Sequence, residues 1–190
     1  MRKSIVVIFL LLIAAGFATA WVFIEDLIME KSHPLEYGKT VEMYAKQYAV
    51  PQEIIYGVMH TESSFESDVV SSKGAIGLMQ ITPETFEWLR FKMGESDTPA
   101  SADLLYNPET NIKYGTYYLS LLYTEFGVWE TAYAAYNAGR NKVNEWLNEP
   151  GNNNNGKLVN IPYKETSEYV VNVAKAAENY KELYFNNEDK

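Results

Sequence analysis

The same helix-start signal occurs twice in the middle of this sequence, and it limits the possible folds more than any other feature. The segments TPE (82–84) and NPE (107–109) each place a capping residue before proline and glutamate. Such a cap accepts a hydrogen bond from a free backbone N–H, proline fits the first helical turn, and glutamate favours the positive end of the helix dipole. The second signal predicts a long helix to about Phe126, because Gly127 follows as a stop.

Apolar residues at helical spacing predict further helices on both sides of these two. The predicted helices cover residues 35–50, 51–62, 128–139, 141–149 and much of 161–185. The segment 63–77 has the Ser, Asp and Gly content of a loop with short extended pieces, and GNNNNG (151–156) is a low-complexity loop. We therefore expect a mainly α protein, a single helical domain with at most a small sheet between Glu62 and Ile81.

Composition excludes several classes of protein. Hydrophobic residues make up 47% and aromatic residues 14% of the chain, which is enough for a packed core and argues against global disorder. The formal charge of −9 argues against nucleic acid as a partner, because phosphate binding needs a basic face. The sequence has no cysteine, which excludes disulfides, thiol nucleophiles and cysteine zinc sites. His33 and His60 are the only histidines and no HExxH motif occurs, so neither a metal nor a cofactor is expected.

The N-terminus predicts where the protein works. Residues 4–24 form a run of 21 residues without charge, long enough to span a bilayer as a helix, with Arg2 and Lys3 on the cytoplasmic side. The alternative is a signal peptide cleaved after the small-x-small sequence ATA (18–20), which would secrete the protein. The apolar run continues past that point and places Trp21 like an interfacial anchor. We therefore favour a single-pass anchor in the cell membrane.

These patterns divide the chain into three parts. Residues 1–24 are the anchor or signal segment, residues 25–34 form a polar connector, and residues 35–190 form the folded domain. Both interpretations of the first part export everything that follows it. We expect a monomer, and the sequence identifies no protein partner.

One acidic residue interrupts an apolar stripe. Ile55, Val58 and Met59 recur at helical spacing, and the next position on that face is Glu62. In one interpretation the stripe ends there and Glu62 is solvated. In the other, Glu62 is half-buried at a helix C-terminus, where desolvation and the negative end of the dipole both raise its pKa. A carboxylic acid that stays protonated near neutral pH can donate a proton to a glycosidic oxygen, which would make Glu62 a catalytic acid.

Ordered sequence blocks resemble the motifs of a known family. They are ESSF (62–65), GAIGLMQITP (74–83), NPETNIKYG (107–115), AYNAG (135–139) and IPYKETSEYV (161–170). Together they resemble the catalytic domain of the lytic transglycosylases of the soluble-Slt type, relatives of goose-type lysozyme. The resemblance covers roughly residues 36–185. It implies a lysozyme-like α+β fold in which helices dominate, and a bacterial enzyme that acts on the glycan strands of peptidoglycan without a cofactor.

The resemblance also implies roles for particular residues. Glu62 would be the single catalytic acid and then the base. The residues implied to bind the glycan are Ser63, Ser71, Gly77, Gln80, Tyr136, Asn137 and Tyr169. Gly77 would let the backbone approach the sugar closely, and Tyr169 would place a hydroxyl beside the Glu62 carboxyl. Each also has a structural alternative, since the glycine can serve a turn, Asn137 a helix end and the tyrosines the core.

The reaction implied by the resemblance is cleavage of the β-1,4 bond between N-acetylmuramic acid and N-acetylglucosamine, with formation of a 1,6-anhydro end. Two alternatives stay open. A lysozyme-type muramidase would need a second carboxylate to activate water, for which Asp103 and Glu109 are unplaced candidates. Glu66 and Asp68 lie in a polar loop and are expected to be solvated. A catalytically silent wall-binding module of a secretion or assembly machine would be expected to lose the acid.

Overall fold

The computed structural model describes residues 16–17, 19–21, 23–24, 27–97 and 99–186. The chain divides into two compact units, residues 1–34 and residues 35–190. In the first unit, the described residues up to Ser32 are helical, and these include part of the predicted connector. Among the described residues, no helix is both long enough and apolar enough to cross a membrane. Most of the predicted anchor lies outside the described residues, so the anchor stays a prediction.

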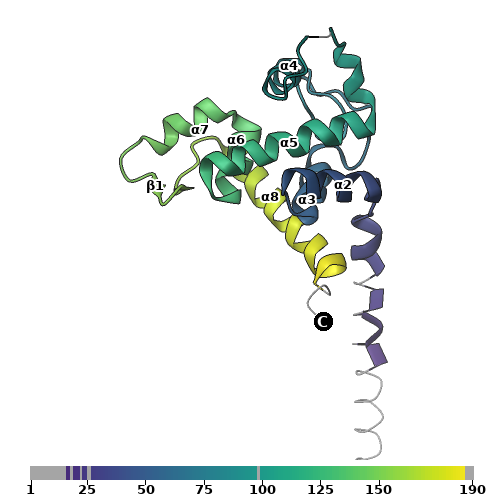
Figure 1. The fold of residues 1–190 in the computed structure, drawn as a ribbon. Helices are drawn as coiled ribbons and strands as arrows, with labels where there is room; N and C mark the ends of the chain where they lie inside the picture. The colour runs from purple at the N-terminus through teal and green to yellow at the C-terminus, as the bar shows by residue number, and fades with distance from the viewer. Residues whose placement is uncertain (1–15, 18, 22, 25–26, 98, 187–190) are drawn as a thin grey trace, which may run out of the picture. The chain divides into compact units, whose positions relative to one another are not determined.

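The second unit consists mainly of helices that share one hydrophobic core (Figure 1). In chain order its helical elements are α2 (Gly38–Tyr48), α3 (Gln52–Ser63), α4 (Pro83–Lys92), the 3-10 helix η1 (Ala102–Tyr106), α5 (Pro108–Phe126), α6 (Trp129–Ala138), α7 (Arg140–Leu147), α8 (Lys164–Tyr180) and the π-type turn η2 (Lys181–Phe185). The prediction of a mainly α fold is confirmed.

α4 and α5 begin where the sequence signals place them. The Thr82 hydroxyl accepts a hydrogen bond from the Thr85 N–H at 3.1 Å, and the Asn107 side chain accepts one from the Thr110 N–H at 3.0 Å. α5 ends at Gly127, whose φ of 70° is in the left-handed region that favours glycine. Both predicted starts and the predicted stop are confirmed.

The packing of α3 against α8 fixes the C-terminal end of α3. A Cβ at Gly57 would lie 2.9 Å from the Ala177 backbone nitrogen, so the two helices approach too closely for a side chain there. Their shared core includes side chains with almost no exposed surface: Ile55, Tyr56, Val58, Met59, Val173 and Tyr180. Because α3 is held along this face, the helix presents Glu62 at the edge of the core rather than in open solvent.

The regular strands lie away from the predicted place. β1 (Asn153–Asn154) lies inside the predicted low-complexity loop of residues 151–156, and it pairs antiparallel with β2 (Lys157–Leu158), which follows directly after that loop. The two residues between them, Asn155 and Gly156, both have positive φ, as a tight hairpin turn requires. Between Glu62 and Ile81 the described structure contains only isolated bridges, which pair residue 76 with residues 70 and 81. The prediction of no more than a small sheet is therefore confirmed, with bridges alone between Glu62 and Ile81 and the regular strands in the later hairpin.

Candidate active site

Glu62 lies half-buried in the last turn of α3. It continues the stripe of Ile55, Val58 and Met59, which are fully buried, and it lines a hollow of about 550 Å³ together with Asn137 and Tyr169. The helix ends directly after it, with Ser64 in a left-handed cap conformation. The solvated interpretation of Glu62 is therefore wrong, and the half-buried interpretation describes its position.

The surroundings of Glu62 favour its protonated form. Burial raises the pKa of the Glu62 carboxyl from about 4.5 to about 7, while a hydrogen bond from the Tyr169 hydroxyl acts in the opposite direction. That hydroxyl donates to Oε1 of Glu62 at 2.7 Å. Among the described residues, no ion pair includes Glu62. At neutral pH the carboxyl is therefore divided between its acid and base forms, so it can both donate and accept a proton.

Tyr136 and Tyr169 add two neutral hydroxyls to this region. Burial raises the pKa of both phenols well above 10, and the negative charge of Glu62 raises each of them further. Both hydroxyls therefore stay protonated and act as donors. The Tyr136 hydroxyl donates to the carbonyl oxygen of Met79 at 2.7 Å, which connects α6 to the segment 74–81.

The segment 74–81 is held tightly by side chains. Ser63 donates to the Leu78 carbonyl at 2.8 Å, which joins the end of α3 to this segment. Gln80 is a non-glycine residue with a φ of 48°, and its side-chain amide donates to the carbonyl oxygens of Val69 and Gly77. Such strained backbone conformations are concentrated at functional sites, where the surrounding structure holds them in place.

The predicted glycan-binding residues fall into two groups. Asn137 and Tyr169 share the hollow with Glu62, and Asn137 also accepts a hydrogen bond from the Thr166 hydroxyl at 2.8 Å. In contrast, Ser63 is buried, and the Ser71 hydroxyl accepts a bond from the Ala75 N–H within its own turn. Those two side chains are therefore engaged in holding the backbone around the hollow, and so is the amide of Gln80.

Position 77 requires glycine because of a tertiary contact, which the sequence alone does not reveal. A Cβ there would lie 2.4 Å from the side-chain nitrogen of Asn111 and 2.6 Å from the Leu105 carbonyl oxygen. The space beside Gly77 is thus filled by this chain itself. Sequence analysis missed Asn111, a fully buried residue of α5. The available signal was an amide on the apolar face of a helix, next to Ile112 and four residues before Gly115.

The carboxylates considered for a second catalytic group do not lie in the Glu62 hollow. Glu66, Asp68, Asp103 and Glu109 are all exposed and absent from its lining. The acidic residues that do line it, besides Glu62, are Glu165 and Glu168 on α8. Each of these is exposed and paired with a lysine, Glu165 with Lys73 and Glu168 with Lys164. Sequence analysis did not consider either of them.

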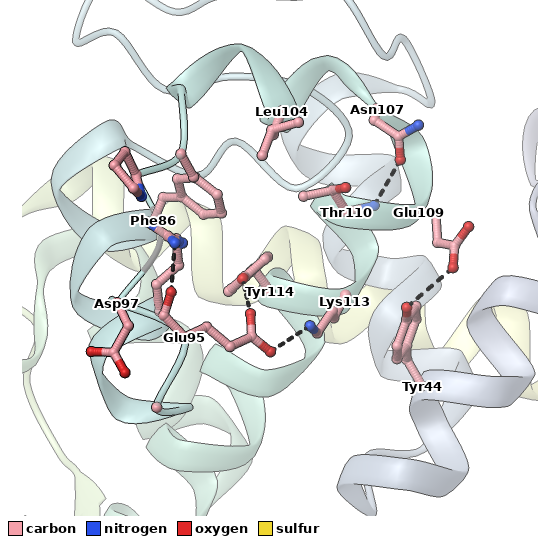
Figure 2. Close-up of a pocket in the computed structure, with 14 residues that line it drawn as sticks. Tyr44, Phe86, Glu95, Asp97, Leu104, Asn107, Glu109, Thr110, Lys113 and Tyr114 are labelled. Atoms are coloured by element: carbon pink, nitrogen blue, oxygen red, sulfur yellow. Dashed lines mark hydrogen bonds and ion pairs between the residues drawn. The ribbon is translucent and has the colours of Figure 1, made fainter.

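A larger hollow, of about 760 Å³, lies elsewhere, beside the first turns of α5 (Figure 2). Two of its carboxylates accept hydrogen bonds from other residues of the lining. Glu95 accepts hydrogen bonds from Lys113 and Tyr114, and Glu109 accepts one from Tyr44 (Figure 2). Glu62 is not part of its lining, so this hollow is not the candidate active site. Within the described part of the chain, no group of three or more metal-binding side chains is found.

Comparison with known proteins supports the family that the motif blocks resemble. A family model described as the transglycosylase SLT domain matches residues 39–159. The chain belongs to this family. The matched range begins in α2 and contains Glu62, the segment 74–81, and Tyr136.

Curated relatives in the family carry names of lytic murein transglycosylases. The soluble lytic murein transglycosylase of Escherichia coli K12 is 38% identical over 150 residues, which cover 76% of this chain and 23% of that protein. The membrane-bound lytic murein transglycosylase C of Yersinia pestis is 33% identical over 168 residues, covering 77% of this chain and 47% of that protein. This SLT-domain chain thus spans about a quarter to a half of the length of these relatives.

Solved structures of the family have the same fold. The 70-kDa soluble lytic transglycosylase of Escherichia coli superposes with a TM-score of 0.73 and 33% identity, over 83% of this chain and 26% of that one. An inactive mutant of the lytic transglycosylase Slt from Pseudomonas aeruginosa gives a TM-score of 0.69 and 32% identity, over 79% and 24% of the two chains. The predicted fold and family are therefore confirmed.

Proposed function

We propose that this chain is a peptidoglycan lytic transglycosylase. It would cleave the β-1,4 bond between N-acetylmuramic acid and N-acetylglucosamine and leave a 1,6-anhydro end on the muramic acid. The observation that carries the proposal is the state of Glu62, a half-buried carboxyl with a pKa of about 7 and a tyrosine hydroxyl at 2.7 Å. The names of the curated relatives support the same reaction class.

In the proposed mechanism, Glu62 acts twice. Its protonated form donates a proton to the glycosidic oxygen, and the bond to the anomeric carbon breaks. The substrate's own acetamido group stabilises the positive charge that develops at this carbon. The Glu62 carboxylate then removes the proton from the 6-hydroxyl of the muramic acid, whose oxygen forms the new bond to the same carbon. The hydroxyl is already attached to the ring, so its high effective concentration favours it over water.

The roles of the surrounding residues follow from their contacts. Tyr169 orients the Glu62 carboxyl and favours the anionic form that arises after the first proton transfer. Asn137 lines the same hollow and would contact the sugar or its substituents. Ser63, Ser71, Gly77 and Gln80 would shape the groove chiefly through the backbone of the segment 74–81.

Mass spectrometry of fragments released from purified peptidoglycan tests the reaction. With the full chain we expect muropeptides that are lighter by one water than hydrolysis products, and none with the control Glu62→Gln. Reducing ends instead would establish a lysozyme-type muramidase, and Glu165 and Glu168 would become the candidates for the second carboxylate. If the folded chain binds peptidoglycan but releases no fragments, the alternative function, a wall-binding module, would be supported instead.

The proposed place of action is outside the cytoplasm. The uncharged run of residues 4–24 would hold the catalytic domain at the cell membrane, and its cleavage would release the domain instead. The two cases differ in the mass of the mature chain, because cleavage after residue 20 removes the start of the sequence. Intact mass measurement on protein from the membrane and from the medium separates them.

A ligand of a relative offers a second test. The soluble lytic transglycosylase of 70 kDa has been solved in complex with bulgecin A. If the groove here has the same chemistry, bulgecin A should bind this chain in competition with peptidoglycan. Calorimetric titration of the wild type and of Glu62→Gln would measure this without relying on turnover.

A further inference from the structure

The backbone of Met79 is held on both sides by side chains from different helices. Its N–H donates to the side-chain oxygen of Asn111 in α5 at 2.8 Å, and its carbonyl oxygen accepts from the Tyr136 hydroxyl in α6 at 2.7 Å. Met79 itself is fully buried, and its side chain packs where Gly115 leaves space on α5. One residue of the segment 74–81 therefore connects α5 to a tyrosine that lies within the electrostatic influence of Glu62.

Asn111 has no capacity left for other partners at its amide nitrogen. In addition to the bond from Met79, it donates to the carbonyl oxygens of Ile76 and Leu105 at 2.8 and 2.7 Å. The side chain is fully buried, so losing these bonds would remove a buried partner from the Met79 N–H and from the Ile76 and Leu105 carbonyls, although the Ile76 carbonyl would keep its bond from the Ile81 N–H. A single amide thus sets the position of two backbone segments, residues 74–81 and η1, relative to α5.

Gly77 is the steric counterpart of this amide. Its φ is 76°, and a Cβ at this position would lie 2.4 Å from the Asn111 side-chain nitrogen, so only a hydrogen atom fits. The backbone of the segment 74–81 therefore lies directly against the amide. A small displacement of Asn111 must be passed on to Met79, because packed interiors have little free volume.

We infer that Asn111 is a positioning residue for the Glu62 site: it fixes the backbone of Met79, which accepts the bond from Tyr136. The segment 74–81 that contains Met79 is joined to the end of α3 next to Glu62 by the bond from Ser63 to Leu78. Asn111 does not line the Glu62 hollow and acts only through these neighbours. The inference deepens the proposed transglycosylase function and rests on it for its kinetic consequence. Its structural consequence, the environment of Glu62, is measurable without any reaction.

The test compares Asn111→Ala with a matched control elsewhere in the domain. Asn152 is also buried, donates to the Trp146 carbonyl at 3.0 Å and accepts from the Asn160 N–H at 2.6 Å, so Asn152→Ala removes a similar buried amide. These contacts lie around the β1–β2 hairpin and do not include residues 74–81. Both variants should lose stability. A lower free energy of unfolding therefore does not distinguish a positioning role from general destabilisation.

Two measurements distinguish positioning from general destabilisation. For Asn111→Ala we expect kcat on peptidoglycan to fall by roughly tenfold to a hundredfold with KM changed less than about threefold, because the segment 74–81 no longer holds the Glu62 site in its productive geometry. Titration of the Glu62 carboxyl by carbon NMR should give a pKa lower by about half a unit or more, because a displaced Tyr136 admits water. Asn152→Ala should keep kcat within about twofold and leave the Glu62 titration unchanged.

A double-variant cycle identifies the route. Tyr136→Phe removes only the hydroxyl that holds the Met79 carbonyl, so it should act on the same contact from the other side. If both residues act through Met79, the double variant is about as impaired as the worse single variant. Effects that multiply, or an Asn111→Ala variant that behaves like Asn152→Ala, would overturn the inference.

Two further outcomes are covered by the same design. If Asn111→Ala does not fold, Asn111→Asp keeps the acceptor for Met79 but loses the bonds donated to Ile76 and Leu105, and the same shifts are expected at smaller size. If the wild type releases no fragments from peptidoglycan, the proposed function fails. The Glu62 titration still decides the role of Asn111 in that case, and an unchanged titration would refute it.

Discussion

Glu62 and Glu95 each accept a hydrogen bond from a tyrosine hydroxyl, but the pKa values of the two carboxyls shift in opposite directions. Tyr169 is the partner of Glu62, and Tyr114 is the partner of Glu95. Burial raises the pKa of Glu62 to about 7. Hydrogen bonds from Lys113 and Tyr114 lower the pKa of Glu95, with the nearby charges of Lys113 and Arg90 adding to the effect.

The difference between the two sites shows what makes a carboxyl suitable for proton transfer. Glu95 has 39% of its side chain exposed and an ion pair with Lys113 at 2.8 Å, so its anion is stable. Glu62 is less exposed than Glu95 and, among the described residues, forms no ion pair, since Lys164 in the same hollow is paired with Glu168. A tyrosine hydroxyl is therefore compatible with either state, and burial without a cation determines which one results.

The largest expected effect is on activity, and it separates the two glutamates. Glu62→Gln removes the only proposed acid and base while keeping the shape of the side chain, so turnover on peptidoglycan should fall by roughly a thousandfold or more. Glu95→Gln should keep kcat within about threefold, because Glu95 lines the hollow of Figure 2 and not that of Glu62. Equal losses in the two variants would show that the activity does not depend on the environment of Glu62.

A smaller effect is expected from the tyrosine partners. Tyr169→Phe removes a hydrogen bond that favours the Glu62 anion, so the pKa of Glu62 should rise above about 7. The protonated form that starts the reaction then persists to higher pH, so the alkaline limb of the pH–rate profile should move to higher pH. We expect kcat to fall by about tenfold, because the bond that orients Glu62 and stabilises its anion is lost. Tyr114→Phe should raise the pKa of Glu95 as well, since the bond acts in the same direction there. A pH–rate profile of Tyr169→Phe that shifts to lower pH contradicts this account.

The two glutamates should also affect stability with opposite dependence on pH. The folded-state pKa of Glu62 is raised, so the folded protein binds more protons and loses stability as the pH rises from about 4.5 through about 7. Glu62→Gln removes this loss. The free energy of unfolding of the variant minus that of the wild type should therefore be larger at pH 8 than at pH 4.5, by about 1 to 3 kcal/mol.

Glu95 has a lowered pKa, so its contribution to stability is present at neutral pH and is lost as the pH falls through the folded-state value. Because its side chain is well exposed, Glu95→Gln should cost less than about 1 kcal/mol at pH 8. Urea unfolding of the wild type, Glu62→Gln and Glu95→Gln at pH 4.5 and pH 8 measures both stability effects. A Glu62→Gln variant that is less stable than the wild type at pH 8 would contradict the sign.

The comparison also shows which features a sequence can predict. The starts of α4 and α5 are predictable because a cap and its donor lie three residues apart in Thr82–Thr85 and Asn107–Thr110. Glu62 is identifiable because it interrupts a local apolar pattern. Asn111 escapes sequence analysis because its partners Ile76 and Met79 lie more than thirty residues away, and no periodicity links them.

The β1–β2 hairpin escapes it for a different reason. Composition alone marks the asparagine run of residues 152–155 as a loop, although Asn155-Gly156 is a strong sequence signal for a two-residue hairpin turn. The hairpin also depends on a contact that is not local, since the Thr131 hydroxyl donates to the Gly156 carbonyl and accepts from the Leu158 N–H. The pairing of each glutamate with its tyrosine is equally non-local, which is why the sequence alone could not order their pKa values.

The smallest expected effect comes from removing the cation that distinguishes Glu95. Lys113→Met keeps much of the aliphatic stem of the side chain. It removes the hydrogen bond that contributes most to lowering the pKa of Glu95, together with the smaller effect of the Lys113 charge. The pKa of Glu95 should then rise, which can be followed by carbon NMR. It should still remain below that of Glu62, because Glu95 keeps its exposure and its bond from Tyr114. If the pKa of Glu95 instead reached about 7 in this variant, the cation alone would account for the contrast, and burial would not be the cause of the raised pKa at Glu62.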